Sequence, residues 1–354
     1  MTAWVKSSRS PIAIDLGHHQ IKAVQLRRAK DGWQIAAAAM VPRRGDGDFP
    51  DKSELERLRG VLLRRGFIGQ RVVLSVPRPR VQTEVMELPP RHSGAPVDDI
   101  ARTEMARMQR WESDRFEMRV WDLPAPARAQ ESTHIMAAAC LHEDANQLLD
   151  LFESDGWHVI AMDIEPWAIA RACNGHNTHC DNILAALDLG ATHTHFVLMH
   201  DQVVVYDRQL NDVGIGPLRQ SLIDGLRLEP AVADHVICDI GIDCDQAPPD
   251  DRRWDQQGGD ARNIITQQLD QLCVELQTSL SYGSRSYPNA SVDRLMLVGG
   301  GATMPGIARY LTQALDIDVK VVASRDVASC PAPLASLCQS PAMAISMGLA
   351  LHGQ

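Results

Sequence analysis

The order of apolar and polar positions along the chain predicts two similar units of strands and helices, with a block of different pattern between them. In the first unit, residues 12–16, 21–26 and 33–41 are apolar enough to form three buried strands joined by tight turns. A helix with leucines on one face is predicted over about 54–65, and a short buried strand over 71–76 closes the unit.

The second unit, which begins at residue 183, repeats this arrangement. The stretch ILAALDLGATHTHFVLM is followed by DQVVVYDRQL and by a helix from about Ile215, which again gives strand, Asp-x-Gly turn, strand, strand and helix. In an alignment of the two units, DLGHHQIK stands against DLGATHTH. Self-similarity of this kind indicates that two related structural units make up most of the chain.

The block between the units, residues 79–156, is called the insertion below and has the order strand, helix, strand, strand, helix. Such a βαββα segment can form a small sheet that helices cover on one face. The predicted elements are a strand at 81–88, a helix at 97–110, strands at 116–123 and 133–140, and a helix at 143–154.

Three signals predict the rest of the second unit. Residues 241–260 are rich in Pro, Gly and Asp and are predicted as an exposed loop. A strand at about 293–298 ends in three glycines, and another helix follows it. Between the loop and this strand a long helix is predicted, because apolar residues recur at helical spacing at Ile265, Leu269, Leu272, Leu276 and Leu280.

Two helix starts are predicted from capping residues. Ser53 and Glu56 have the spacing of a capping box at the start of the first helix. Thr303 is predicted to cap the helix after the glycines, with Pro305 in its first turn.

Composition and charge narrow the class of protein. With 354 residues the chain is long enough for two lobes or more, and 45% hydrophobic with 23% charged residues is typical of a soluble globular protein. A formal charge of -10 argues against a nucleic-acid binder, which usually presents a basic face. No apolar run reaches the roughly 18 residues of a membrane helix and the N-terminus lacks a signal-peptide core, so we expect a cytoplasmic protein without direct membrane insertion. The eight cysteines include no CxxC pair and are expected to be free thiols.

Glycine turns at matching places in the two units point to phosphate chemistry. Gly17 and Gly190 let the backbone approach a ligand closely, so two facing hairpins can hold a phosphate chain from both sides. Asp15 and Asp188, each two residues before its glycine, are placed to orient water molecules around Mg²⁺. The later glycine run at 299–301 offers a flat backbone surface for an adenine ring. A single Asp-x-Gly is usually an ordinary turn, but the ordered set is more specific.

This ordered set resembles the actin-like ATPase superfamily, whose fold is shared by actin, hexokinases and Hsp70 chaperones. The likeness is greatest to the PilM family of type IV pilus assembly proteins, with FtsA of cell division as a near relative. It covers about residues 11–351 and rests on IAIDLGHHQIKAVQL, EPWAIARA, LAALDLGATHTHFVL, VELQTSLSYGSRS, LMLVGGGATMPGIARYL and AMAISMGLAL. The resemblance implies an α/β, two-lobed actin-like ATPase fold in which the βαββα insertion takes the place of subdomain 1C.

The resemblance also divides the chain into two lobes and the inserted subdomain. The expected parts are a first lobe (1A) of residues 1–78 and 157–178 with 330–354, the inserted subdomain (1C) of residues 79–156, and a second lobe (2A and 2B) of residues 179–329 with 2B at about 215–270.

Site residues carry over from the family by position, with ATP and Mg²⁺ as the implied cofactors. The first phosphate motif is matched by Asp15, Gly17 and Lys22, and the second by Asp188, Gly190, Ala191, Thr192 and Thr194. The adenosine motif is matched by Gly299, Gly300, Gly301 and Ala302, with Glu275 of the long helix near the ribose. Asp163 lies in the segment where relatives position magnesium or the attacking water, so it is the candidate catalytic residue.

The departure from the family lies at His18 and His19, where PilM relatives usually carry serine or threonine. An imidazole can still donate a hydrogen bond to a phosphate oxygen, so both histidines are candidate nucleotide contacts. They can equally fill the pocket, which would leave a pseudo-ATPase that binds no nucleotide. Together with His193 they can also converge on a metal ion.

A second group of potential metal ligands lies within CNGHNTHC. Two cysteines and two histidines suit zinc in kind, but their spacing lacks the usual paired arrangement, and a polar surface loop is the simpler interpretation. The residues are Cys173, His176, His179 and Cys180.

Methionine and aromatic residues are concentrated in the insertion. Such side chains adapt to partner peptides, although their helical spacing equally fits core packing. In PilM-like proteins this subdomain and its neighbouring groove bind the cytoplasmic N-terminus of the inner-membrane protein PilN. The resemblance therefore implies a PilN-like partner, contacts with other pilus assembly proteins and a peripheral place at the inner membrane. The candidate partner-binding residues are Met86, Met105, Met108 and Trp111.

The resulting hypothesis is a PilM-like scaffold that binds ATP in the interlobe cleft, with weak or no ATPase activity. A sugar or acid kinase of the same superfamily is the enzymatic alternative, and it is disfavoured because the insertion resembles subdomain 1C more than a kinase substrate domain. An FtsA-like filament protein is the other alternative. The terminal LALHGQ directly after the last predicted helix leaves no membrane helix of the kind expected in that class.

Overall fold

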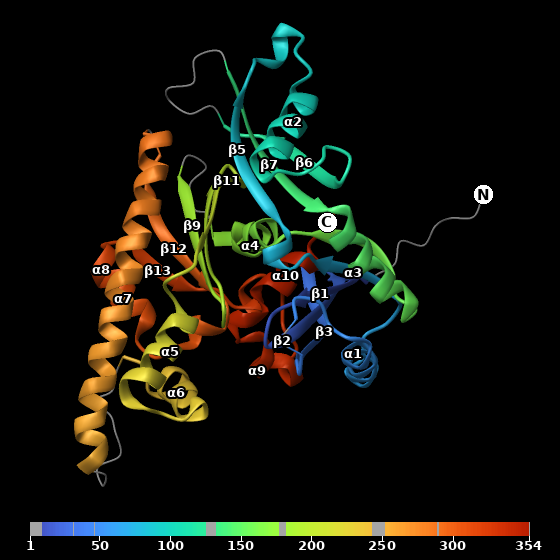
Figure 1. The fold of residues 1–354 in the computed structure, drawn as a ribbon. Helices are drawn as coiled ribbons and strands as arrows, with labels where there is room; N and C mark the ends of the chain where they lie inside the picture. Colours follow the sequence, from blue (N-terminus) through green and yellow to red (C-terminus); the bar gives the residue numbers. More distant parts are fainter. Residues whose placement is uncertain are drawn as a thin grey trace.

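The structure is a computed structural model that describes residues 9–30, 32–45, 47–124, 132–176, 182–242, 252–288 and 290–353, without the side chains of residues 252–257. Two predictions therefore lie partly outside the described residues, namely His179 and Cys180 of the Cys/His group and much of the predicted loop at 241–260. Figure 1 shows two main sheets with helices between and outside them, and the insertion projecting from one end of the molecule.

The two main sheets have the same strand order, which confirms the predicted repeat. In each sheet the first three strands form an antiparallel meander, and two later strands add in parallel beside the first. The first sheet, β3-β2-β1-β4-β8, comprises β1 (Ile12–Leu16), β2 (Gln20–Ala29), β3 (Gly32–Pro42), β4 (Arg71–Ser75) and β8 (His158–Asp163). The second sheet, β11-β10-β9-β12-β13, comprises β9 (Ile183–Leu189), β10 (Thr194–His200), β11 (Val203–Leu210), β12 (Val292–Val298) and β13 (Asp318–Val321).

The insertion has the predicted βαββα order. Its strands form an antiparallel sheet in the order β5-β7-β6, on which helix α2 packs through the fully buried Met105. Helix α3 instead buries Leu148 and Phe152 in the core of the first main sheet, so it links the insertion to the first lobe. The elements are β5 (Gln82–Leu88), α2 (Val97–Gln109), β6 (Phe116–Asp122), β7 (Thr133–Leu141) and α3 (His142–Ser154).

Amphipathic helices cover the outer faces of both main sheets. On the first sheet, α1 (Lys52–Arg64) and α3 bury their apolar stripes against the side chains of β1 to β4. On the second sheet, α5 (Ile215–Leu226), α7 (Arg252–Ser286) and α8 (Ile307–Leu315) do the same, and α7 runs along the whole side of the molecule (Figure 1). None of the helices in the described ranges combines the length and apolarity needed to cross a bilayer.

The layer between the two main sheets consists of α4 (Glu165–Cys173) and α10 (Ala344–Ala350). Helix α4 follows the first sheet along the chain but packs on the second, whereas α10 follows the second sheet and packs on the first. The two helices cross so closely that a Cβ atom on Gly348 would overlap the carbonyl oxygen of Ala168. One apolar core therefore continues through both lobes.

The predicted capping box of the first helix is wrong in position. Asp51, and not Ser53, is the N-cap of α1, because its Oδ1 accepts a hydrogen bond from the backbone N–H of Glu54 at 2.8 Å. Glu54 Oε2 in turn accepts from the backbone N–H of Asp51 at 3.4 Å. The box is therefore formed by Asp51 and Glu54, and Glu56 takes no part in it.

Two helix starts in the second lobe also differ from the prediction. Thr303 lies in a short 3₁₀ turn (Gly300–Thr303), and α8 begins only after Gly306, whose φ of 83° is left-handed. Helix α7 begins at Arg252, inside the predicted loop. Burial of Ala261 and Ile265 on the sheet stabilises this helix in spite of its unfavourable glycines.

Replacement of Gly348 tests the crossing of α4 and α10. We expect Gly348→Ala to lower the free energy of unfolding by about 3 kcal/mol or more, because the added methyl group forces two packed backbones apart. The matched control is Gly259→Ala in α7, where no atom lies within 4 Å of the added Cβ. Helix propensity favours alanine there by about 1 kcal/mol. Urea unfolding measures both variants, and equal stability of the two would contradict the crossing.

Candidate functional site

Two hairpin turns of the same geometry face the space between the lobes. In the β1–β2 turn, a Cβ on Gly17 would lie 2.9 Å from the carbonyl oxygen of Gln20. In the β9–β10 turn, a Cβ on Gly190 would lie 2.7 Å from the carbonyl oxygen of His193. Only glycine fits either turn without displacing the backbone. The two turns are therefore structural equivalents, as the internal repeat predicts.

Two buried aspartates stand at the ends of the strands that lead into these turns. Asp15 of β1 is 1% exposed and Asp188 of β9 is 7% exposed. Lys22 Nζ donates a hydrogen bond to Asp15 Oδ2 at 2.8 Å, whereas Asp188 Oδ1 is buried and accepts no hydrogen bond. One carboxylate is thus paired, and the other has a buried oxygen without a partner.

Burial and crowding set the charge of these groups. Burial raises the pKa of Asp188 to about 7, with repulsion from Asp15 adding to the shift and Lys22 opposing it. Burial likewise raises the pKa of Glu165, at the start of α4, to about 7, and Asp188 adds to this shift. Burial alone would lower the pKa of Lys22, but Asp15 and the other two carboxylates raise it above its ordinary value. The ionised forms of Asp188 and Glu165 are therefore destabilised, whereas the ammonium of Lys22 stays charged.

The glycine run after β12 closes the same space from a third side. Gly299 has a φ of 84°, and a Cβ atom there would overlap Asp188 Oδ1. A Cβ atom on Gly301 would overlap the side chain of Ile215, whereas the space beside Gly300 is open. The run thus packs its backbone tightly against the second hairpin and α5 and leaves a flat surface at Gly300.

Together these segments line a cleft of about 490 Å³, which is a usual size for a small-molecule site. Ile215, Ile237 and Met304 add apolar surface near the glycine run. The predicted nucleotide residues that line the cleft are Asp15, Gly17, His18, His19, Lys22, Asp188, Gly190, Ala191, Thr192, Gly299, Gly300 and Gly301.

The candidate catalytic residue, Asp163, does not line the cleft. It forms an ion pair with Arg171, and its Oδ2 lies 2.9 Å from His352 Nδ1 in a hydrogen bond. Burial alone would raise the pKa of Asp163, but His352 and Arg171 lower it below its ordinary value. Asp163 is therefore a fixed anion at neutral pH and is poorly suited to accept a proton.

Three further predicted residues lie outside the cleft lining. Thr194 is 2% exposed and lies against Gly214 beneath the second hairpin. Glu275 of α7 pairs with Arg208 at 2.7 Å on the outer side of the second sheet. Ala302 is buried beside the glycine run.

Several lining residues were not predicted. Glu165 opens α4, and its signal was an acid at the first position of EPWAIARA, directly after a strand. Arg219 of α5 and Asp234 of α6 (Pro230–His235) form an ion pair at 2.6 Å at the cleft. No sequence signal reveals this pair, because it depends on how α5 packs on α6.

The histidines that depart from the family pattern line the cleft and leave it open. The rings of His18 and His19 lie edge to face, 4.9 Å apart, and His18 Nδ1 is buried without a hydrogen bond. Gln209 Nε2 lies 3.1 Å from His193 Nδ1, and burial, with the nearby His18, lowers the pKa of His193, so this ring is neutral at pH 7. Among the described residues no group of three or more His, Cys, Asp or Glu is placed to hold a metal ion, so a histidine metal site finds no support.

The carboxylates fit a magnesium ion that keeps much of its own water. Asp188 Oδ1 has no partner, and Asp15 Oδ1 accepts only a long hydrogen bond of 3.4 Å from Ser75 Oγ. Mg²⁺ prefers oxygen ligands and is commonly held by one or two carboxylates together with substrate phosphates. Carboxylates also outnumber lysine and arginine among the described residues of the lining, so an anionic ligand has to bring positive charge with it.

Comparison with known proteins places the chain in a family. A sequence model described as type IV pilus assembly protein PilM matches residues 13–354. The chain belongs to the PilM family of type IV pilus assembly proteins. This confirms the resemblance found in the sequence. No curated protein matches the chain.

Solved structures share the fold of this PilM-family chain. A PilM–PilN type IV pilus biogenesis complex matches with a TM-score of 0.76 at 19% identity, over 97% of this chain and 98% of that chain. Ethanolamine utilization protein EutJ from Carboxydothermus hydrogenoformans matches with 0.56 at 13% identity, over 99% and 91%. MreB 5 of Spiroplasma citri bound to AMPPNP matches with 0.53 at 12% identity, over 98% and 96%. These likenesses confirm the predicted two-lobed actin-like fold.

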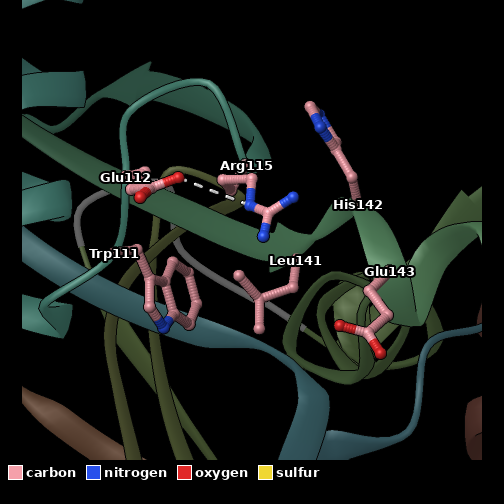
Figure 2. Close-up of a pocket in the computed structure, with 6 residues that line it drawn as sticks. All are labelled: Trp111, Glu112, Arg115, Leu141, His142 and Glu143. Carbon is pink, nitrogen blue, oxygen red and sulfur yellow. Dashed lines mark ion pairs between the residues drawn. The ribbon is translucent and has the colours of Figure 1, made fainter.

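The PilM-family chain has a second hollow, of about 300 Å³, within the insertion, where the segment between α2 and β6 meets the start of α3. In Figure 2 the ring of Trp111, the side chain of Leu141 and the guanidinium of Arg115 lie toward one space, whereas the ring of His142 points away. Arg115 Nε lies 3.5 Å from Glu112 Oε2 in an exposed ion pair. The insertion hollow is lined by Trp111, Glu112, Arg115, Leu141, His142 and Glu143.

The four candidate partner residues lie in two different environments. Trp111 lines the insertion hollow, and Met108 is 40% exposed. Met86 and Met105 are 6% and 0% exposed in the core of the insertion, so they do not present a surface to a partner. The sequence pattern could not separate the exposed Met108 and the hollow-lining Trp111 from the buried Met86 and Met105.

The raised carboxyl pKa values predict how stability changes with pH. An acid whose pKa is higher in the folded chain than in the unfolded chain costs stability once it ionises, so the free energy of unfolding falls as the pH rises from about 4 to about 7. Asp188→Asn removes this titration. We compare the free energy of unfolding of this variant with that of the wild type. The difference in favour of the variant should be larger at pH 8 than at pH 5 by at least about 1 kcal/mol, the energy that corresponds to one pKa unit.

Urea unfolding at both pH values measures this effect. The control is Asp15→Asn, which loses the 2.8 Å ion pair with Lys22 and should destabilise the protein at either pH. A stability profile of Asp188→Asn that runs parallel to the wild-type profile would contradict the assignment.

Proposed function

We propose that the chain is a type IV pilus assembly scaffold that binds ATP with Mg²⁺ in the cleft between its lobes. The observation that carries the proposal is the meeting of two glycine hairpins and a glycine run around one cleft of about 490 Å³. Backbone N–H groups that converge at such turns suit a chain of phosphates. The similar fold of MreB 5 bound to AMPPNP adds support from a protein that holds a nucleotide.

The chemistry of the lining suggests how ATP lies in the cleft. The two hairpins and Lys22 surround the phosphates, and the flat backbone at Gly300 with Ile215 takes the base. Arg219 and Asp234 offer donors and acceptors to the ribose hydroxyls, in the role first expected of Glu275. Imidazole N–H groups of the hairpin histidines replace the hydroxyl donors of relatives.

Asp15 and Asp188 would hold Mg²⁺ through water molecules, next to the phosphates. When bound, the ion neutralises the charge of the phosphates beside these carboxylates. Without it, the buried acids would repel a free nucleotide. We therefore expect ATP to bind as its magnesium complex.

Glu165 is better placed than Asp163 to contact a water molecule that attacks a phosphate. Glu165 lines the cleft, and its pKa of about 7 lets the carboxylate accept a proton near neutral pH. Asp163 is tied to Arg171 outside the lining. A scaffold needs only the bound state, so we expect hydrolysis to be weak.

We also propose that the insertion hollow receives the cytoplasmic N-terminal segment of a PilN-like inner-membrane protein. The fold shared with a PilM–PilN complex supports this partner. The hollow offers a half-buried tryptophan beside exposed charged groups, which is typical of peptide anchor sites. Binding there would hold a cytoplasmic protein at the inner membrane beside other pilus assembly proteins.

The proposed function keeps the lobe boundaries expected from the sequence. We propose that the described residues within 1–78, 157–178 and 330–354 belong to the first lobe, and those within 179–329 to the second. The insertion lies between them as the unit that meets the partner, with α3 packed on the first lobe.

Calorimetric titration of Mg-ATP tests the nucleotide site. We expect magnesium-dependent binding to the wild-type chain, and a loss of about tenfold or more in affinity for Asp15→Ala and Asp188→Ala, as expected when a charged contact is removed. Glu275→Ala, outside the cleft, is the control and should bind as wild type does. No heat from the folded wild-type chain would favour a pseudo-ATPase instead.

Removal of the aromatic anchor tests the partner site. Trp111→Ala should weaken binding of a labelled N-terminal peptide of the PilN-like protein by about 30-fold, the effect of a hot-spot residue worth about 2 kcal/mol. The matched control is Trp33→Ala, a half-buried tryptophan on β3 under Arg28, which should leave the affinity unchanged. Fluorescence anisotropy measures both, and wild-type affinity in Trp111→Ala would exclude the hollow.

A further inference from the structure

A chain of polar side chains, buried at its centre, runs from the cleft between the lobes to the root of the insertion. His195 of β10 and Asp207 of β11 are each only 1% exposed. Charged groups buried this deeply are costly unless they are paired. The members are Glu165, His195, Asp207, Arg78 and Thr83.

Asp207 belongs to the second lobe but binds two groups at the start of the insertion. Arg78 Nη2 donates to Asp207 Oδ2 at 3.0 Å, and Thr83 Oγ1 donates to the same oxygen at 2.6 Å. Arg78 lies in the 3₁₀ turn (Arg78–Arg80) that leads into β5, and Thr83 lies in β5 itself. Burial alone would raise the pKa of Asp207, but His195, Arg78 and Thr83 lower it to about 2, so the carboxylate stays ionised.

His195 stands between Asp207 and the cleft. Its Nε2 is in contact with Asp207 Oδ1. Its Nδ1 is buried without a hydrogen bond, 3.9 Å from Glu165 Oε2. Glu165 has to approach by only about 1 Å to form a hydrogen bond with this nitrogen. Since Glu165 lines the cleft, a ligand there acts directly on the group that faces His195.

We propose that His195 and Asp207 are positioning residues that couple Glu165 in the cleft to the root of the insertion. A ligand that moves Glu165 or changes its charge alters the contacts of Asp207 with Arg78 and Thr83. A partner that tilts β5 acts on the cleft by the same contacts, because coupling between two sites is reciprocal. The inference rests on the proposed function for the ligand, ATP with Mg²⁺, whereas the contacts themselves are present without it.

Two further hydrogen bonds join the insertion to the second lobe independently of the contacts of Asp207. Trp121 Nε1 donates to the carbonyl oxygen of Val204 at 3.2 Å, and the Tyr287 hydroxyl donates to the carbonyl oxygen of Pro124 at 3.2 Å. These contacts keep the insertion attached when a member of the polar chain is replaced. We therefore expect such variants to lose coupling while the insertion stays in place.

Hydrogen exchange of the full chain, with and without saturating Mg-ATP, tests the coupling. In the wild-type protein we expect Mg-ATP to slow exchange in hairpin residues 15–22 and to change exchange in β5 by about fivefold or more, as is usual for coupled sites. Asp207→Asn should keep the hairpin response and lose the β5 response. Thr83→Val, which removes one hydroxyl and keeps the shape, gives the same readout if Asp207→Asn does not fold.

The matched control is Arg208→Gln. Arg208 is next to Asp207 on β11 but faces α7, where it binds Glu275 and Ser279, so its loss should leave both responses as in wild type. A hairpin response without a β5 response in the wild-type chain would overturn the inference. So would wild-type β5 responses in both Asp207→Asn and Thr83→Val.

These outcomes are distinct from a failure of the proposed function. If Mg-ATP leaves the hairpins unprotected, the nucleotide site is wrong, and Glu165→Gln in the ligand-free protein then decides the coupling. Altered exchange in β5 of that variant supports the inference. Unaltered exchange overturns it.

Discussion

The crossing of α4 and α10 between the two main sheets is the contact on which the rest of the structure depends. Each helix follows one sheet along the chain and packs on the other, so the two sheets share one layer of helices and one apolar core. The helices approach this closely because Gly348 leaves room for the backbone of Ala168. Since α4 begins at Glu165, the same crossing places a carboxyl group in the lining of the cleft.

The carboxylates of the cleft differ in how the protein compensates their charge. Asp15 has Lys22 as its partner, but loss of solvent around Asp188 and Glu165 raises the pKa values of these two acids to about 7. A chain selected only for stability would replace them, whereas shifted acids in a cleft are typical of functional sites. A magnesium nucleotide would supply the positive charge that these groups lack, and its phosphate oxygens would complete the ligands of the ion.

Most of the frame could be predicted from the sequence, because strand alternation and helical spacing are local properties. Asp15 and Asp188 were found because each precedes a glycine that the turn requires. Arg219 and Asp234 could not be found, since only the packing of α5 on α6 brings them together. The place of Glu165 in the cleft depends on the packing of α4 on the second sheet, and the capping box of α1 depends on the shape of the preceding loop. Long-range packing, which the sequence pattern does not encode locally, decides these cases.

A crystal structure of the chain with Mg²⁺ and a non-hydrolysable ATP analogue tests the interlobe cleft as the ATP site most directly. The triphosphate is expected between the turns at Gly17 and Gly190, with the base beside Gly300 and the ion next to Asp15 and Asp188. An empty cleft at saturating analogue, or an analogue bound elsewhere on the protein, would contradict the nucleotide site.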